Sequence, residues 1–400
     1  MRKQIVTILW VFALLVENPV FAGSSEAEVR YAFCGDSITI PVNPSVSVPY
    51  NETLSPAAIR TFHETLNAGE WQPIVAVLIA YREEKKLNDW LYYQLVRQTA
   101  QQLSPKANNY YRYTLYKWFL MVKSGYDASL SIRNDQLLFY VYSSDDISDI
   151  PYYIKDNKQY VCLNIHDYAK AAKEQVYIIH SVEIEETGAK NPFSYKITRL
   201  PEFNAAMYDN KEISFPYKNR NYHFVIKLNP QVKSIFSNYP VVDYASYFNI
   251  PLSNITYKSL VPMLKENMKG MKMKKGIDYL MNFTRYAFLY EDDQSNFGKE
   301  KRMGAEETLL SSASDCDDRT ALFFYLVKEM YNLPMIALMY PTHVTIAVQF
   351  DKAFGQTIEY AGKKYSICEP TPQATHLAVG QIAPKYRQMA YSVVYAYTPQ

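Results

Sequence analysis

The sequence predicts an α+β fold in which the hydrophobic pattern changes three times along the chain. Apolar residues first recur at helical spacing, then alternate with a period near two, and finally form helices followed by short strands. These changes predict a signal peptide at 1–22, an extended segment and helical unit at 23–126, a β-rich antiparallel domain at 127–257, and a mixed domain at 258–400.

The N-terminus has the three parts of a secretory signal peptide. Arg2 and Lys3 give a positive start, an apolar run covers 5–16, and small residues end the segment at Ala22. The apolar run is too short for a stop-transfer helix. We therefore expect export to the periplasm or the extracellular space, with no transmembrane span after cleavage. An uncleaved N-terminal anchor is the alternative hypothesis.

Helical spacing begins near Ser55 and predicts a small helical unit that ends at Gly125. Its clearest runs cover 87–103 and 111–122, where apolar side chains recur every three or four residues. The residues before it, 23–50, are rich in Pro, Val and Ser and predict an extended lead-in.

Beyond Leu130 the period falls to two, which is typical of half-buried strands. Asn, Pro and Gly separate the runs, as they do in an antiparallel sandwich or partial barrel. The predicted strands are 137–142, 176–184, 193–198, 212–217 and 222–228. Together they predict a β-rich, sandwich-like domain.

The last part of the chain returns to helices and then ends in strands. Helices are predicted at 259–268, 277–289 and 306–310, and a longer one runs from Cys316 to Tyr331. The strands that follow are predicted at 335–340, 344–350, 358–360, 364–368 and 390–397.

Composition narrows the class of function without choosing one. The 48% hydrophobic content supports real cores, and a net charge of +2 gives no argument for nucleic acid as a partner. Four cysteines are too few for a disulfide-built scaffold, and their spacing matches no zinc pattern. The 37 tyrosines suit strands, interfaces and sugar-stacking surfaces alike, so they only weakly suggest a carbohydrate-associated role.

Cys316 stands at the start of a predicted helix, in the run Ser314 to Arg319. A thiol there meets unsatisfied N–H groups and the positive end of the helix dipole, which favour the nucleophilic thiolate. Asp315, Asp317 and Asp318 oppose this effect, because nearby carboxylates disfavour a second negative charge. Activation of the thiol would therefore depend mainly on a histidine.

Two residues downstream can complete a nucleophile, base and orienter set. His343 follows a Pro341 turn at the entry to a strand, and Glu369 follows the strand 364–368. A carboxylate on a neighbouring strand can orient the imidazole and fix its tautomer. Structural roles are the alternatives: a buried Cys316, a bridge from Cys316 to Cys368, a packing His343, or a turn role for Glu369 before Pro370.

These segments resemble a known family. The resemblance rests on Gln294–Gly298, 306–309, 314–319, 340–343 and 365–371, and it covers about residues 258–385. Together they look like the bacterial transglutaminase-like proteins of the papain-like cysteine superfamily. The family order is Cys, His and Asp, with the Cys at the start of a helix that packs on a small antiparallel sheet. This resemblance implies such a core at the C-terminus.

The resemblance also implies roles for individual residues. Cys316 would be the nucleophile and His343 the general base and acid, while Glu369 stands where Asp is usual. Gln294 is the candidate for an oxyanion-hole side chain, with the backbone N–H of Cys316 as a second donor. No metal or organic cofactor is required.

The resulting hypothesis is an exported thiol enzyme. It would act on peptide or amide bonds of a protein or peptide substrate through a thioester, with hydrolysis or amide transfer as the outcome. The alternative is a catalytically silent transglutaminase-like protein that serves as an envelope binding or assembly module, with recognition by the β-rich domain.

Overall fold

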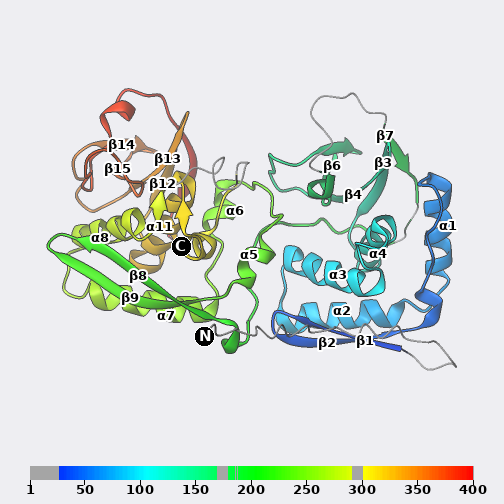
Figure 1. Cartoon of the computed structure of the whole chain (residues 1–400). Coiled ribbons are helices and arrows are strands. Elements are labelled where there is room, and N and C mark those ends of the chain that lie inside the picture. The colour runs from blue at the N-terminus through cyan, green and yellow to red at the C-terminus, as the bar shows by residue number, and fades with distance from the viewer. Residues whose placement is uncertain (1–26, 169–178, 185, 187, 291–300, 400) are drawn as a thin grey trace, which may run out of the picture.

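The computed structural model describes residues 27–168, 179–184, 186, 188–290 and 301–399. Within them the chain is α+β, as the sequence predicts, with two antiparallel five-stranded sheets that curl into half-barrels. The predicted signal peptide lies outside the described residues. Figure 1 shows the two sheets in separate halves of the molecule, with α5 (Gln231–Ile235) and α6 (Tyr244–Phe248) between them.

The N-terminal half begins with a β-hairpin and four helices. The hairpin is β1 (Ala27–Phe33) with β2 (Asp36–Val42), which pack on α3 and α2 respectively. Polar caps start three of the helices, because the side chains of Ser55, Asn88 and Asn109 accept hydrogen bonds from backbone N–H groups of the first turn. The helices are α1 (Pro56–Asn67), α2 (Gln72–Lys85), α3 (Asp89–Leu103) and α4 (Tyr110–Lys123).

The first sheet packs one face on α4 and has the strand order β5-β6-β4-β3-β7. Its central strand β4 is buried almost throughout, and a small cluster of Leu138, Tyr140, Tyr160 and Cys162 forms on one face. Its strands are β3 (Ala128–Arg133), β4 (Gln136–Tyr142), β5 (Tyr152–Lys155), β6 (Lys158–Cys162) and β7 (Ile179–Val182). The predicted strand 176–184 begins outside the described residues.

The strand prediction for 193–198 is wrong, although the alternation behind it is real. Phe193, Tyr195 and Ile197 are buried in the core. The backbone N–H of Ser194 donates to the Asp89 carboxylate at 2.9 Å, and that of Tyr195 donates to the Asp145 carboxylate at 2.6 Å. In a sheet, these N–H groups would donate to carbonyls of a neighbouring strand. The segment is therefore extended and half-buried without belonging to a sheet.

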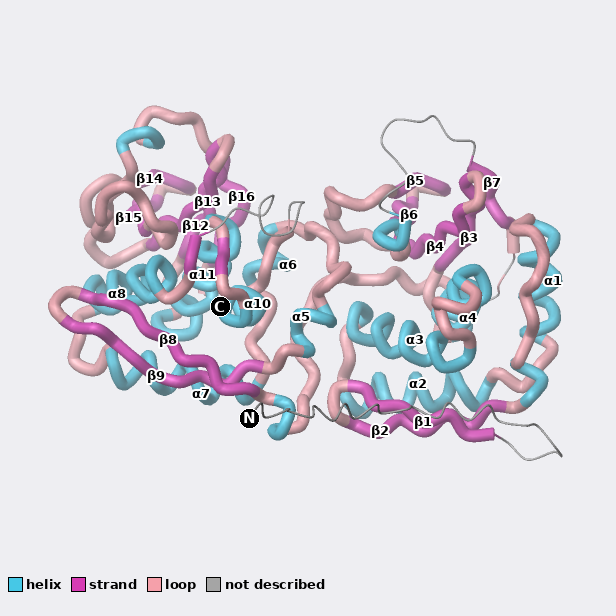
Figure 2. The backbone as a smooth tube through the Cα atoms, viewed as in Figure 1, coloured by secondary structure: helices cyan, strands magenta, loops and turns pink. Residues whose placement is uncertain are grey.

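A long hairpin links the halves in sequence and packs on the helices that follow it. β8 (Asp209–Tyr217) pairs with β9 (Arg220–Leu228) over its full length. β9 contacts α7 (Asn254–Asn267) and β8 contacts α8 (Met273–Tyr286). Figure 2 shows this hairpin running alongside both helices in the half that carries the second sheet.

The second sheet has the order β14-β15-β13-β12-β16, and α11 (Cys316–Tyr331) packs on β13. α8 and α10 (Ala305–Leu310) flank α11, and the opposite face of the sheet carries a separate apolar cluster around Tyr340 and Tyr386. The strands are β12 (Met335–Tyr340), β13 (His343–Val348), β14 (Thr357–Tyr360), β15 (Lys363–Cys368) and β16 (Ser392–Tyr397). A short parallel pair, β10 (Leu289–Tyr290) with β11 (Ala313–Ser314), leads into α11.

A fully buried guanidinium fixes the start of α11 against the end of α8. The Nη1 and Nη2 atoms of Arg319 donate to four backbone carbonyls at 2.6–3.1 Å. The acceptors are the carbonyls of Thr284, Arg285, Phe288 and Leu289. These groups include carbonyls of the last turn of α8, which have no partner within their own helix. A cation at a helix C-terminus also interacts favourably with the helix dipole.

None of the helices in the described part of the chain combines the length and the apolar character needed to cross a lipid bilayer.

We predict that Arg319→Lys destabilises the protein by about 2–4 kcal/mol, because an ammonium cannot serve four carbonyls and leaves buried acceptors unpaired. Chemical denaturation followed by circular dichroism would measure this loss. Arg60→Lys is the matched control, since Arg60 is exposed on α1. A loss for Arg319→Lys no larger than that of the control would contradict this role.

Candidate functional site

Cys316 is the first residue of α11, and a capping box of aspartates fixes its position. The Asp315 carboxylate accepts hydrogen bonds from the N–H groups of Asp317 and Asp318, at 3.0 and 3.2 Å. Asp318 in turn accepts from the N–H of Asp315 at 3.3 Å. Two of the three aspartates that flank the thiol are therefore cap residues, so their first role is to start the helix.

The Cys316 thiol is partly buried and lies among polar groups of opposing effect. Its Sγ donates to Asp317 Oδ1 at 3.4 Å, and the backbone N–H of Val344 donates to the sulfur. Burial raises the pKa of this thiol well above its ordinary value, and the charges of Asp317 and Asp315 raise it further. The Val344 N–H lowers it but does not offset the rise. Together these influences favour the protonated thiol over the thiolate.

His343 and Glu369 form a buried pair. His343 is the first residue of β13, and Glu369 directly follows β15, so adjacent strands bring them together. His343 Nε2 lies 2.7 Å from Glu369 Oε2, and both side chains are almost inaccessible to water. A carboxylate accepts the Nε2 hydrogen in this arrangement, which leaves Nδ1 as the ring nitrogen that can take up a proton.

Three further contacts fix the geometry of the pair. The other carboxylate oxygen of Glu369 accepts the N–H of Thr371 at 2.9 Å. The carbonyl of Glu369 accepts Arg285 Nε at 2.7 Å. The ring of Tyr386 stacks on the imidazole at 4.7 Å between centroids, with 10° between planes. The imidazole is thus held at one edge and on one face, as an oriented base requires.

The helix that begins at Cys316 contacts β13 at Val344, the residue after His343. Thr320, one turn after Cys316, donates to the Val344 carbonyl at 3.1 Å, while the Val344 N–H reaches the Cys316 sulfur. Val344 packs into the core with α11, whereas the His343 ring stacks on Tyr386. Between the described side chains of Cys316 and His343 there is no hydrogen bond.

Tyr290, the last residue of β10, interacts electrostatically with Cys316 and with Tyr386. Partial burial raises the pKa of Tyr290 to about 12; the acidic groups of Cys316, Asp315 and Tyr386 act in the same direction, and Arg319 opposes them. Tyr290 therefore lies within electrostatic range of both the thiol and the ring that stacks on His343. The structure brings His343 and Glu369 into direct contact, and the helix that begins at Cys316 packs on the strand that begins at His343.

Gln294, the predicted oxyanion-hole side chain, lies outside the described residues. Several neighbours of the site were not singled out from the sequence: Tyr244, Arg285, Arg302 and Tyr386. They reach the site from separate elements, so no local motif could have indicated them. Asp317 was noted beside Cys316, but its contact with the thiol depends on the side-chain conformation.

The cysteines and the possible metal ligands add two observations. All four cysteines are free, so Cys316 and Cys368 are not bridged, and Cys368 is buried in β15. In the residues that the structure describes, no three His, Cys, Asp or Glu side chains are grouped closely enough to hold a metal ion. Among the described side chains of the site, the reactive groups are the thiol of Cys316, the imidazole of His343 and the carboxylate of Glu369.

Comparison of the chain with protein-family models, with curated proteins and with solved structures found no match in any of the three.

We predict that iodoacetamide labels Cys316 of the resting protein slowly, with a pH midpoint above the ordinary thiol value of about 8.5, because only the thiolate reacts. Mass spectrometry of the Cys316 peptide between about pH 6 and about pH 10 would measure the rates, with Cys316→Ala as the blank and glutathione as the reference thiol. Fast labelling of wild-type protein well below pH 8 would contradict the raised pKa.

Proposed function

We propose that this chain is a thiol enzyme of the transglutaminase-like type that acts on peptide or amide bonds through a thioester. The observation that carries the proposal is the buried 2.7 Å contact between His343 and Glu369, in a sheet whose strand β13 packs against the helix that begins at Cys316. An imidazole oriented by a carboxylate in this way is the base of nucleophile–base–orienter sites. We further propose that the protein is exported, which the N-terminal pattern predicts.

The reaction would begin with a proton transfer inside the site. Cys316 turns its S–H from Asp317 to Nδ1 of His343 and gives up the proton, and Glu369 stabilises the imidazolium. The thiolate sulfur forms a bond to the carbonyl carbon of the substrate. Backbone N–H groups at the start of α11, including that of Cys316, would stabilise the oxyanion, with Gln294 as the proposed side-chain donor.

The second half of the reaction regenerates the thiol. The C–N bond of the tetrahedral intermediate breaks as the leaving amine takes the proton from His343, and a thioester remains on Cys316. Water or a second amine then attacks the thioester after giving a proton to His343. The C–S bond breaks, the sulfur regains its proton, and the product is an acid or a new amide. We favour hydrolysis for an exported protein.

Both outcomes can be tested with one set of variants. Wild-type protein is expected to cleave fluorogenic peptide amides or to attach a fluorescent amine to a glutamine-containing protein such as casein. Cys316→Ala and His343→Ala should lower either activity by roughly a thousandfold or more. His376→Ala, which removes an exposed histidine, should leave the activity unchanged.

Activity that survives Cys316→Ala would overturn the proposal. No activity on either class of substrate, together with selective retention of an envelope component by the wild-type protein and by Cys316→Ala alike, would favour the silent binding or assembly protein.

We predict that Glu369→Gln keeps the fold but lowers kcat by roughly a hundredfold or more, because an amide can hold the imidazole in the wrong tautomer. Glu369→Asp should retain much more activity, because it keeps the carboxylate at the cost of one methylene. Steady-state kinetics of both variants would test this, with the denaturation midpoint as a check on folding. Equal activities for Glu369→Gln and wild type would show that Glu369 does not orient His343.

A further inference from the structure

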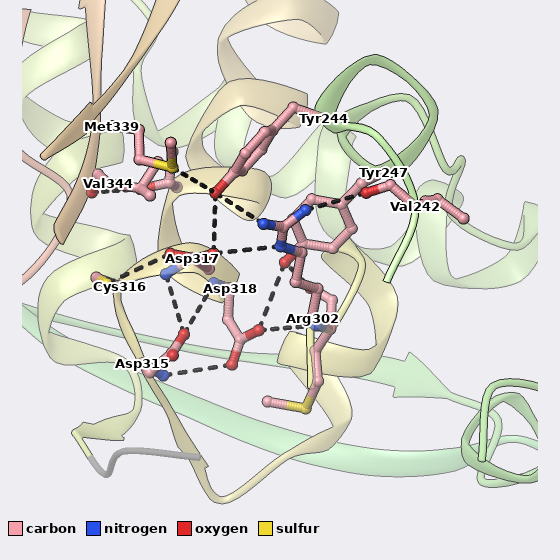
Figure 3. Close-up of polar contacts among 12 residues, drawn as sticks. Val242, Tyr244, Tyr247, Arg302, Asp315, Cys316, Asp317, Asp318, Met339 and Val344 are labelled. Carbon is pink, nitrogen blue, oxygen red and sulfur yellow. Dashed lines mark hydrogen bonds and ion pairs between the residues drawn. The ribbon is translucent and has the colours of Figure 1, made fainter. Parts of the chain in front are cut away.

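Asp317 is not part of the capping box that Asp315 and Asp318 form, and its carboxylate makes three other contacts. Its Oδ1 accepts the Cys316 thiol at 3.4 Å. Its Oδ2 accepts the Tyr244 hydroxyl at 3.3 Å and forms an ion pair with Arg302 Nε at 3.4 Å. Figure 3 shows the carboxylate between the sulfur on one side and Tyr244 with Arg302 on the other. One oxygen is thus bound to the protein scaffold while the other faces the thiol.

Arg302 and Tyr244 are themselves held in place. Arg302 Nη1 donates to the Val242 carbonyl at 3.0 Å, and Nη2 donates to the Tyr244 hydroxyl at 3.1 Å. The guanidinium also lies over the Tyr244 ring, 4.1 Å from its centroid. Tyr244 is buried at the start of α6, between the two halves of the molecule. Asp317 therefore has little freedom to turn away from the sulfur.

We propose that Asp317, held by Arg302 and Tyr244, locks the Cys316 thiol in a protonated resting state that substrate entry must release. This inference rests on the proposed role of Cys316 as the nucleophile. The lock acts in two ways. The carboxylate disfavours a thiolate beside it, and it directs the S–H away from His343.

The other groups around Cys316 do not cancel this effect. The Val344 N–H and the helix start favour the thiolate, while burial and the charge of Asp315 disfavour it together with Asp317. Arg302 partly neutralises Asp317, but its guanidinium contacts the oxygen that faces away from the sulfur. Among the described residues, other charged or titratable groups near the site include Tyr244, Tyr247, Arg285, Tyr290, Asp318, Arg319, His343, Glu369 and Tyr386.

The lock has a chemical advantage for a protein exported into an oxidising compartment. Oxidation and alkylation of cysteine proceed through the thiolate, so a protonated thiol is protected until it is used. A substrate carbonyl that enters beside the sulfur would compete with Asp317 for the S–H of Cys316, and for the groups that donate to Asp317, such as the Tyr244 hydroxyl. The proton could then pass to His343 only when a substrate is present, which couples activation to binding.

The test is the pH dependence of iodoacetamide labelling at Cys316 in Asp317→Asn. This variant keeps the size of the side chain and removes its charge. The labelling midpoint should fall by about one pH unit or more, so that labelling near pH 8 is about tenfold faster than in wild type. Asp351→Asn, which removes an exposed carboxylate after β13, should leave the rate unchanged. Asp317→Ala provides a second variant, and thermal unfolding would check that each protein is folded.

A second pair of variants separates this inference from the proposed function. If both are correct, His343→Ala added to Asp317→Asn should remove most of the gain in labelling rate, because the freed proton passes to His343. An equal gain with and without His343 would support the lock and count against the catalytic proposal. Labelling of Asp317→Asn that is no faster than wild type, or no faster than Asp351→Asn, would overturn the lock.

Discussion

The candidate site depends on the buried guanidinium of Arg319. Desolvation lowers the pKa of Arg319 to about 10, so the group remains charged at neutral pH and must be paired. Its partners are carbonyls rather than a single carboxylate, and they come from the end of α8 and from the segment that becomes β10. The Arg319 side chain thereby joins the first turn of α11 to a carbonyl 31 residues earlier in the chain. Because Arg319 lies one turn after Cys316, the same contacts place the thiol.

A second guanidinium extends this constraint to the other end of the site. The Arg285 carbonyl accepts Arg319, and Arg285 Nε donates to the Glu369 carbonyl at 2.7 Å. Glu369 then holds His343. The helix that begins at Cys316 and the strands that position His343 and Glu369 are thus connected through backbone carbonyls and two buried arginines. The connection fixes Glu369 relative to the start of α11 through backbone carbonyls, so no carboxylate besides Glu369 takes part in it.

The sequence could predict those parts of the fold that are encoded locally. α11 and β12 begin and end where their patterns indicate, because Asp315 caps the helix and Asn332 adopts the left-handed conformation at its end. The sequence also indicated Cys316, His343 and Glu369 as a set, and two of them, His343 and Glu369, are in direct contact. The failure at 193–198 has a different origin. Alternating burial is the same for a paired strand and for an extended segment whose N–H groups bind Asp89 and Asp145.

The state of the thiol could not be predicted from the sequence, since it depends on how opposing effects balance in three dimensions. The helix start and the Val344 N–H favour a thiolate, but burial is the largest influence and acts against it, with Asp317 and Asp315 in support. A thiolate would become favourable only beside a cation. In the proposed reaction that cation is the imidazolium of His343, whose other nitrogen contacts Glu369. The proposed reaction therefore requires the proton of the resting thiol to move to the imidazole pair as a substrate binds.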